Sequence, residues 1–155
     1  MTRTLSRLLT DYGMIFVLVL LCAFFSLATF SEQSPTGEAA ARQVAAVLEA
    51  KFGKSPRVLI AARDQADEVL FANKLEAALS ASGAKVLAVV KGEPKEARAA
   101  LQKIVASGES LDAIASTRAT AAWLVFADVK GDFPKLGDPQ VVQPRTEKWP
   151  NFLKS

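Results

Sequence analysis

A long uncharged run near the N-terminus constrains this chain more than any other feature. No charged residue stands between Asp11 and Glu32, and the stretch Gly13–Phe30 is almost wholly apolar. A helix over that stretch satisfies its own backbone hydrogen bonds and is about long enough to cross a bilayer. In water, its apolar surface on every side would need a much larger protein to cover it. The sequence therefore predicts a single transmembrane helix.

The charges that flank this run predict its orientation. Arg3 and Arg7 precede it, whereas Glu32 and Glu38 are the first charges that follow it. Basic residues are enriched on the cytoplasmic side of membrane spans. We therefore expect a bacterial inner-membrane protein with a cytoplasmic N-terminus and with the remaining residues outside the cytoplasm.

The apolar run could also be a cleaved signal peptide or a lipoprotein signal, and the mature protein would then lack a transmembrane helix. A cleaved signal peptide has an apolar region of about 7–15 residues before a cleavage site of small residues. The present run is longer, and Ser26-Leu27-Ala28 is a poor cleavage site. A lipoprotein signal needs a small residue before its cysteine, but Leu21 precedes Cys22. An uncleaved anchor is the favoured interpretation, and a signal peptide is the alternative.

Composition excludes several kinds of chemistry. The chain has no histidine and a single cysteine, Cys22, so it contains no serine–histidine or cysteine–histidine nucleophile and no internal disulfide. A zinc site would have to consist of carboxylates alone. The net charge is only +3, and the basic residues are scattered rather than gathered in a stripe that binds nucleic acid. We expect no catalytic residues, no metal, no cofactor and no nucleic-acid partner.

The remaining chain alternates between apolar runs typical of buried strands and stretches with helical spacing. This order predicts an α/β fold with an open parallel sheet in a three-layer, Rossmann-like domain. Residues 1–34 would form the N-terminus and anchor, residues 35–145 the domain, and residues 146–155 a segment that returns to the membrane. The predicted strands are 57–62, 85–90, 111–115 and 139–143, and the predicted helices are 36–52, 64–82, 94–107 and 120–129. Thr36 and the pair Asp64 and Asp67 are the expected N-terminal caps.

Polar and basic residues follow each predicted strand. Parallel sheets bind ligands beyond the carboxyl ends of their strands, so these residues would share one rim that suits a hydroxyl-rich or anionic small molecule. Exposed surface cations are the alternative interpretation. The turn after the first strand lacks the glycine motifs that bind a dinucleotide or a nucleoside triphosphate. The candidate ligand-binding residues are Arg63, Asp64, Lys91, Ser116, Thr117, Arg118 and Arg145.

At both ends, the sequence resembles a family of membrane proteins. The apolar N-terminal run and the sequence Trp149-Pro150-Asn151-Phe152-Leu153 look like the first membrane span, and the start of the second, in ribose-type sugar ABC transporter permeases. The region between them, with its Ala62-Arg63-Asp64 turn and a predicted strand from Leu111 leading to Trp123, is similar to one lobe of periplasmic sugar-binding proteins.

This resemblance implies the N-terminal part of a sugar permease that carries an inserted extracytoplasmic domain. The domain would dock or position the substrate-binding protein. The implied partners are the membrane, the remaining permease spans, an ABC ATPase subunit, a periplasmic sugar-binding protein and a sugar-like small molecule. The alternative is a membrane-tethered module that binds or senses a sugar-like molecule without a transporter.

Overall fold

The computed structural model describes residues 12–29, 34–53 and 55–146, and it divides the chain into two compact units. The larger unit, Ser34–Glu147, contains the sheet and its covering helices. The other unit contains helix α2 (Gly13–Thr29). The predicted membrane-return segment, 146–155, lies outside the described residues apart from its first residue.

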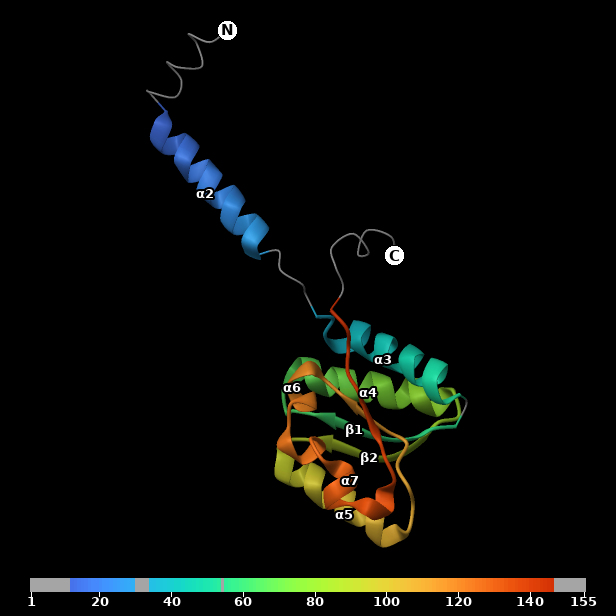
Figure 1. The fold of residues 1–155 in the computed structure, drawn as a ribbon. Helices are drawn as coiled ribbons and strands as arrows, with labels where there is room; N and C mark the ends of the chain where they lie inside the picture. Colours follow the sequence, from blue (N-terminus) through green and yellow to red (C-terminus); the bar gives the residue numbers. More distant parts are fainter. Residues whose placement is uncertain (1–11, 30–33, 54, 147–155) are drawn as a thin grey trace. The chain divides into compact units, whose positions relative to one another are not determined.

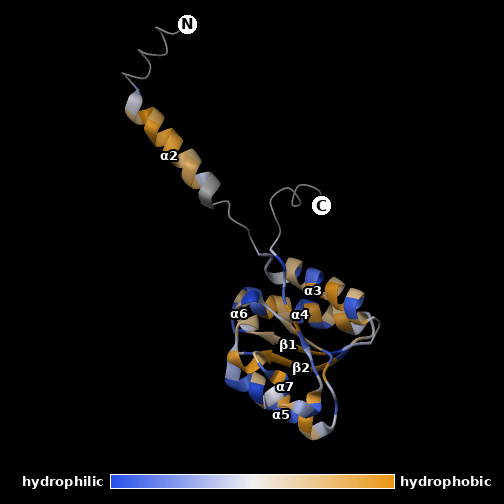
Figure 2. Ribbon diagram, viewed as in Figure 1, coloured by the Kyte–Doolittle hydropathy of each residue, from blue (hydrophilic) through white to orange (hydrophobic). Residues whose placement is uncertain are grey.

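Helix α2 is apolar along most of its length, as the orange ribbon in Figure 2 shows. It has 17 residues, which corresponds to a length of about 26 Å, whereas the hydrocarbon core of a bilayer is about 30 Å thick. Among the described residues, no helix is both long and apolar enough to cross a membrane. The transmembrane helix predicted over Gly13–Phe30 is therefore not found.

The sheet has four parallel strands in the order β2-β1-β3-β4, which confirms the predicted parallel α/β fold. The two central strands, β1 and β3, are buried almost throughout, because helices cover both of their faces. This explains why they are nearly continuous apolar runs in the sequence. The strands are β1 (Arg57–Ala62), β2 (Lys85–Lys91), β3 (Ala113–Ser116) and β4 (Gln140–Val142).

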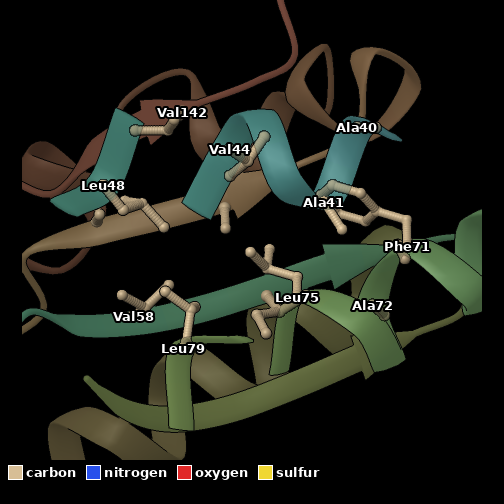
Figure 3. Packing of buried hydrophobic residues seen from close by; sticks show 14 residues of the cluster. Ala40, Ala41, Val44, Leu48, Val58, Phe71, Ala72, Leu75, Leu79 and Val142 are labelled. Atoms are coloured by element: carbon tan, nitrogen blue, oxygen red, sulfur yellow. The ribbon is translucent and has the colours of Figure 1, made fainter. Parts of the chain in front are cut away.

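Helices lie on both faces of this sheet, which gives the predicted three layers (Figure 1). On one face, α3 (Gly37–Phe52) and α4 (Ala66–Ala81) pack against each other and against the strands. Figure 3 shows side chains of α3, α4 and β1 gathered in one buried cluster, among them Val44, Leu48, Leu75 and Val58. The other face is covered by α5 (Pro94–Ser107) and by short turns between β3 and β4.

Glycine and proline set several helix ends where the sequence predicts them. Helix α3 follows Thr36 and ends before Gly53, and α5 starts at Pro94 and ends before Gly108. Gly108 has a φ of 77°, in the left-handed region that glycine adopts without the strain imposed by a Cβ atom. Thr36 occupies the predicted N-cap position of α3, although its side chain makes no capping hydrogen bond.

The predicted cap of α4 is wrong. Its N-cap is Gln65, which makes no side-chain capping bond, and Asp64 lies outside the helix. Asp67 and Glu68 lie in the first turn, where the helix dipole favours negative charge. The acidic residues near Asp64 therefore indicated a helix start but not the residue that caps it.

The single helix predicted over 120–129 is also wrong. Several side chains in this segment form hydrogen bonds with the backbone, and such bonds compete with a continuous helix. The segment therefore forms a series of short helical turns. Thr117 and Thr120 form a capping box, and Asp128 accepts a hydrogen bond from the Gly131 amide at 2.8 Å. The segment consists of α6 (Arg118–Ala121), the 3₁₀ turn η1 (Leu124–Phe126), α7 (Val129–Asp132) and the 3₁₀ turn η2 (Pro134–Leu136).

Leu75→Ala tests the packing between the sheet and α3 and α4. Leu75 is fully buried, so its truncation should lower the free energy of unfolding by about 3 kcal/mol. Leu124→Ala is the control, because Leu124 is 88% exposed and its loss should change stability by less than about 0.5 kcal/mol. Urea denaturation of the full chain measures both, and equal effects would contradict the described core.

Candidate functional site

The carboxyl ends of β1 and β3 open into a recess of about 220 Å³. The first residues of α3, α4 and α6 surround this recess. Three of the predicted ligand-binding residues line it, namely Arg63, Thr117 and Arg118. Asp67 and Glu68 also line it, so the described wall carries two arginines and two carboxylates, and its formal charges balance.

Glu68 organises the floor of the recess. This glutamate is only 8% exposed, and its carboxylate accepts hydrogen bonds from both neighbouring strand ends. The Arg63 amide donates to Oε2 at 2.7 Å and the Arg63 Nε donates to Oε1 at 2.7 Å. The hydroxyl of Thr117 donates to Oε2 at 3.1 Å. The carboxylate thus holds the loop after β1 and the loop after β3 against the first turn of α4.

These contacts set the protonation behaviour of Glu68. Burial by itself raises the pKa of the Glu68 carboxyl, because it disfavours the charged form. Hydrogen bonds from the side chain and backbone of Arg63 and from Thr117, together with the Arg63 charge, outweigh burial and hold that pKa below its ordinary value. Glu68 is therefore ionised at neutral pH, and its charge is matched by that of Arg63.

A pair of threonines fixes the loop after β3. The Thr120 hydroxyl donates to the Ala61 carbonyl of β1 at 2.8 Å and accepts from the Thr117 amide at 2.9 Å. The Thr120 amide in turn donates to the Thr117 hydroxyl at 3.2 Å. Because Thr120 is completely buried, these bonds anchor the start of α6 to β1 and define the wall of the recess.

Arg118 lies at the mouth of the recess. Its guanidinium Nη1 donates to the Ser34 hydroxyl at 2.7 Å, which connects α6 to the segment that precedes α3. The side chain is otherwise exposed. Arg63 also keeps donors for a ligand, because its contacts with Glu68 use Nε and Nη2 and leave Nη1.

The structure places the other four predicted residues elsewhere. Lys91, at the end of the outer strand β2, donates to the Asn73 Oδ1 at 2.6 Å. Ser116 is fully buried and donates to the Val142 carbonyl at 3.2 Å, so it joins β3 to β4. Asp64 is exposed and does not line the recess. Arg145 lines a separate groove beside β4.

Sequence reasoning missed two residues that build the recess. Glu68 lies five positions after Arg63, and nothing in the local pattern separates it from an ordinary acidic residue of a first helical turn. Thr120 had a usable signal, since a threonine three residues after Thr117 matches the spacing of a capping box. The prediction of a longer helix starting at Thr120 hid that signal.

Comparisons with known proteins give one distant similarity of fold. No protein-family model and no curated protein matches the chain. A solved ABC transporter substrate-binding protein from Desulfitobacterium hafniense, in complex with Leu, is similar with a TM-score of 0.49 and 21% sequence identity. The match covers 68% of this chain but only 31% of that protein. It does not show the permease part of the expected family, and it is too distant to carry a conclusion about function.

Glu68→Gln tests the floor of the recess through its pH dependence. A lowered carboxyl pKa stabilises the fold above the ordinary glutamate pKa of about 4.3, and this contribution is lost as pH falls through the folded-state value. The variant should lose about 2 kcal/mol of stability near neutral pH. Its loss should shrink as the pH falls below about 4.

Urea denaturation at a series of pH values measures this effect. Glu76→Gln is the matched control, because Glu76 is an exposed residue of the same helix. A constant difference between wild type and Glu68→Gln at all pH values would contradict the assigned role of the carboxylate.

Proposed function

We propose that the Ser34–Glu147 domain binds a small, neutral, hydroxyl-rich molecule such as a sugar in the recess beyond β1 and β3. The observation that carries the proposal is the balance of charge on the recess wall, where two arginines stand with two carboxylates. An anionic ligand would gain from the arginines and lose to the carboxylates. A polyhydroxyl ligand can donate to one kind of group and accept from the other.

The available groups divide into donors and acceptors. Arg63 Nη1 and Arg118 can donate to ligand oxygens, and the exposed Asp67 carboxylate can accept from ligand hydroxyls. Phe71 and Ala40 lie behind the wall of the recess and are almost completely buried in the core. The Thr117 hydroxyl already bonds to Glu68 and to the Thr120 amide, so its role is to shape the wall.

The size of the recess supports weak binding by this domain alone. A volume of about 220 Å³ is below the usual range of about 300–1,000 Å³ for ligand pockets. It therefore suits part of a ligand, and a second surface would enclose the rest. We expect a dissociation constant on the order of 1 mM for a pentose, which corresponds to about 4 kcal/mol of binding free energy.

The proposed role is binding without chemistry. Glu68, the buried carboxylate of the recess, is fully engaged by Arg63 and Thr117 and is held ionised, so it is poorly suited to donate a proton. We also propose that the domain serves an ABC importer and that it lies outside the cytoplasm. Both derive from the family resemblance of the sequence.

Titration of the full chain with D-ribose tests the site. Amide signals of Gln65 and Thr117 should shift in NMR spectra, because both residues line the recess. Arg118→Ala and Asp67→Asn should each weaken ribose binding about tenfold, by loss of a charged hydrogen-bonding partner. Arg98→Ala is the control, because Arg98 is an exposed residue of α5 outside the recess and should leave the affinity unchanged.

D-ribonate distinguishes a balanced site from an anion site. It keeps hydroxyls and adds a carboxylate, so the proposal predicts that it binds no more tightly than ribose. Binding of ribonate at least tenfold tighter than ribose would overturn the neutral ligand class. The absence of shifts with ribose and with other neutral pentoses and hexoses would overturn the site itself.

A further inference from the structure

The two outer strands of the sheet present different edges to solvent. The β2 edge has features that discourage pairing with another strand. Lys85 and Lys91 stand at its two ends, and Lys85 is paired with Glu109 at 2.7 Å. The register with β1 shifts between Val58 and Leu59, which leaves Leu87 without a counterpart, as in a β-bulge.

The β4 edge lacks a register shift and exposes backbone groups. The Gln140 amide donates to the Asp112 carbonyl at 3.2 Å, and the Val142 carbonyl accepts from Ser116 Oγ at 3.2 Å. Both residues therefore direct their backbone groups toward β3. Because these directions alternate along a strand, the N–H and C=O of Val141 point away from β3. Among the described strands, none pairs with β4 on that side.

A groove of about 510 Å³ runs along this edge, between β4 and α3. Its apolar wall includes Val47 of α3 and Val141, which is 37% exposed. Its charged side chains are Lys51, Arg118 and Arg145, and no carboxylate is among the described residues that line it. This charge differs from that of the recess, where acidic and basic groups balance.

We propose that the β4 edge binds an extended, acidic peptide segment of a partner protein, which adds a strand to the sheet. The Val141 backbone would form ladder bonds with that segment. Because β4 has only three residues, the ladder offers few bonds, and the three basic side chains supply further attraction for alternate acidic side chains. A second copy of this chain is a poor occupant, since it would bring the same basic groups face to face.

A pair of synthetic peptides tests this proposal on the full chain. The first is a capped seven-residue peptide in which glutamate alternates with threonine and valine, and the second has lysine in place of each glutamate. The acidic peptide should bind with a dissociation constant on the order of 100 µM and slow the hydrogen exchange of the Val141 amide. Raising the salt concentration should weaken it, and the basic peptide should bind at least tenfold more weakly.

Variants separate the backbone and the charge contributions. Val141→Pro removes the outward N–H at an edge position where proline is tolerated, so peptide binding should fall at least tenfold. Val141→Thr keeps that N–H and should retain binding. Lys51→Glu combined with Arg145→Glu should also weaken the acidic peptide at least tenfold, and this pair keeps the test valid if the proline variant does not fold. Lys103→Glu, beside the β2 edge, is the matched control and should have no effect.

Three results would overturn the proposal. The first is equal binding of the acidic and basic peptides. The second is binding of the acidic peptide that leaves the Val141 amide unprotected, since the ladder would then be absent. The third is self-association of the full chain that Val141→Pro abolishes, because the edge would then serve a second copy. Ribose binding should persist in the Lys51 and Arg145 variants, so failure of this proposal is distinguishable from failure of the ligand site.

Discussion

The candidate site depends on the hydrogen bonds that the Glu68 carboxylate accepts. An ionised carboxylate this well buried is costly unless its oxygens receive hydrogen bonds. Arg63, at the end of β1, and Thr117, at the end of β3, supply those bonds from two neighbouring strands. Because one group on α4 satisfies both loops, the recess has a fixed floor, and Arg63 is held with part of its guanidinium available.

The recess and the groove beside β4 differ in charge. The recess contains equal numbers of arginines and carboxylates, whereas the groove beside β4 is lined by basic groups without a described acidic partner. Arg118 lines both. Arg118 therefore has acidic neighbours, Asp67 and Glu68, in the recess, where the formal charges balance, and no described carboxylate beside it in the groove, where the charge is positive.

The spatial order of the strands explains why the predicted ligand-binding residues do not all lie together. The argument from strand ends correctly places Arg63, Thr117 and Arg118 at the carboxyl edge. It treats all four strands as equivalent, but β2 and β4 are the outer strands. Lys91, the last residue of β2, and Arg145, which follows β4, therefore belong to opposite edges of the sheet. A sequence pattern indicates where each strand ends but not which strands are adjacent in the sheet. It also does not show that the Ser116 hydroxyl donates to the Val142 carbonyl of the neighbouring strand.

The layered α/β fold could be predicted from the amino-acid sequence, because burial on both faces makes β1 and β3 continuous apolar runs, and because glycines such as Gly108 mark the helix ends. These are local properties, readable from neighbouring residues. Only the three-dimensional arrangement established the pairing of Glu68 with Thr117, which lie 49 positions apart, and the anchoring of Thr120 to the Ala61 carbonyl of β1. Such contacts depend on which loops lie together at the edge of the sheet, and the hydrophobic periodicity of a sequence does not indicate which loops these are.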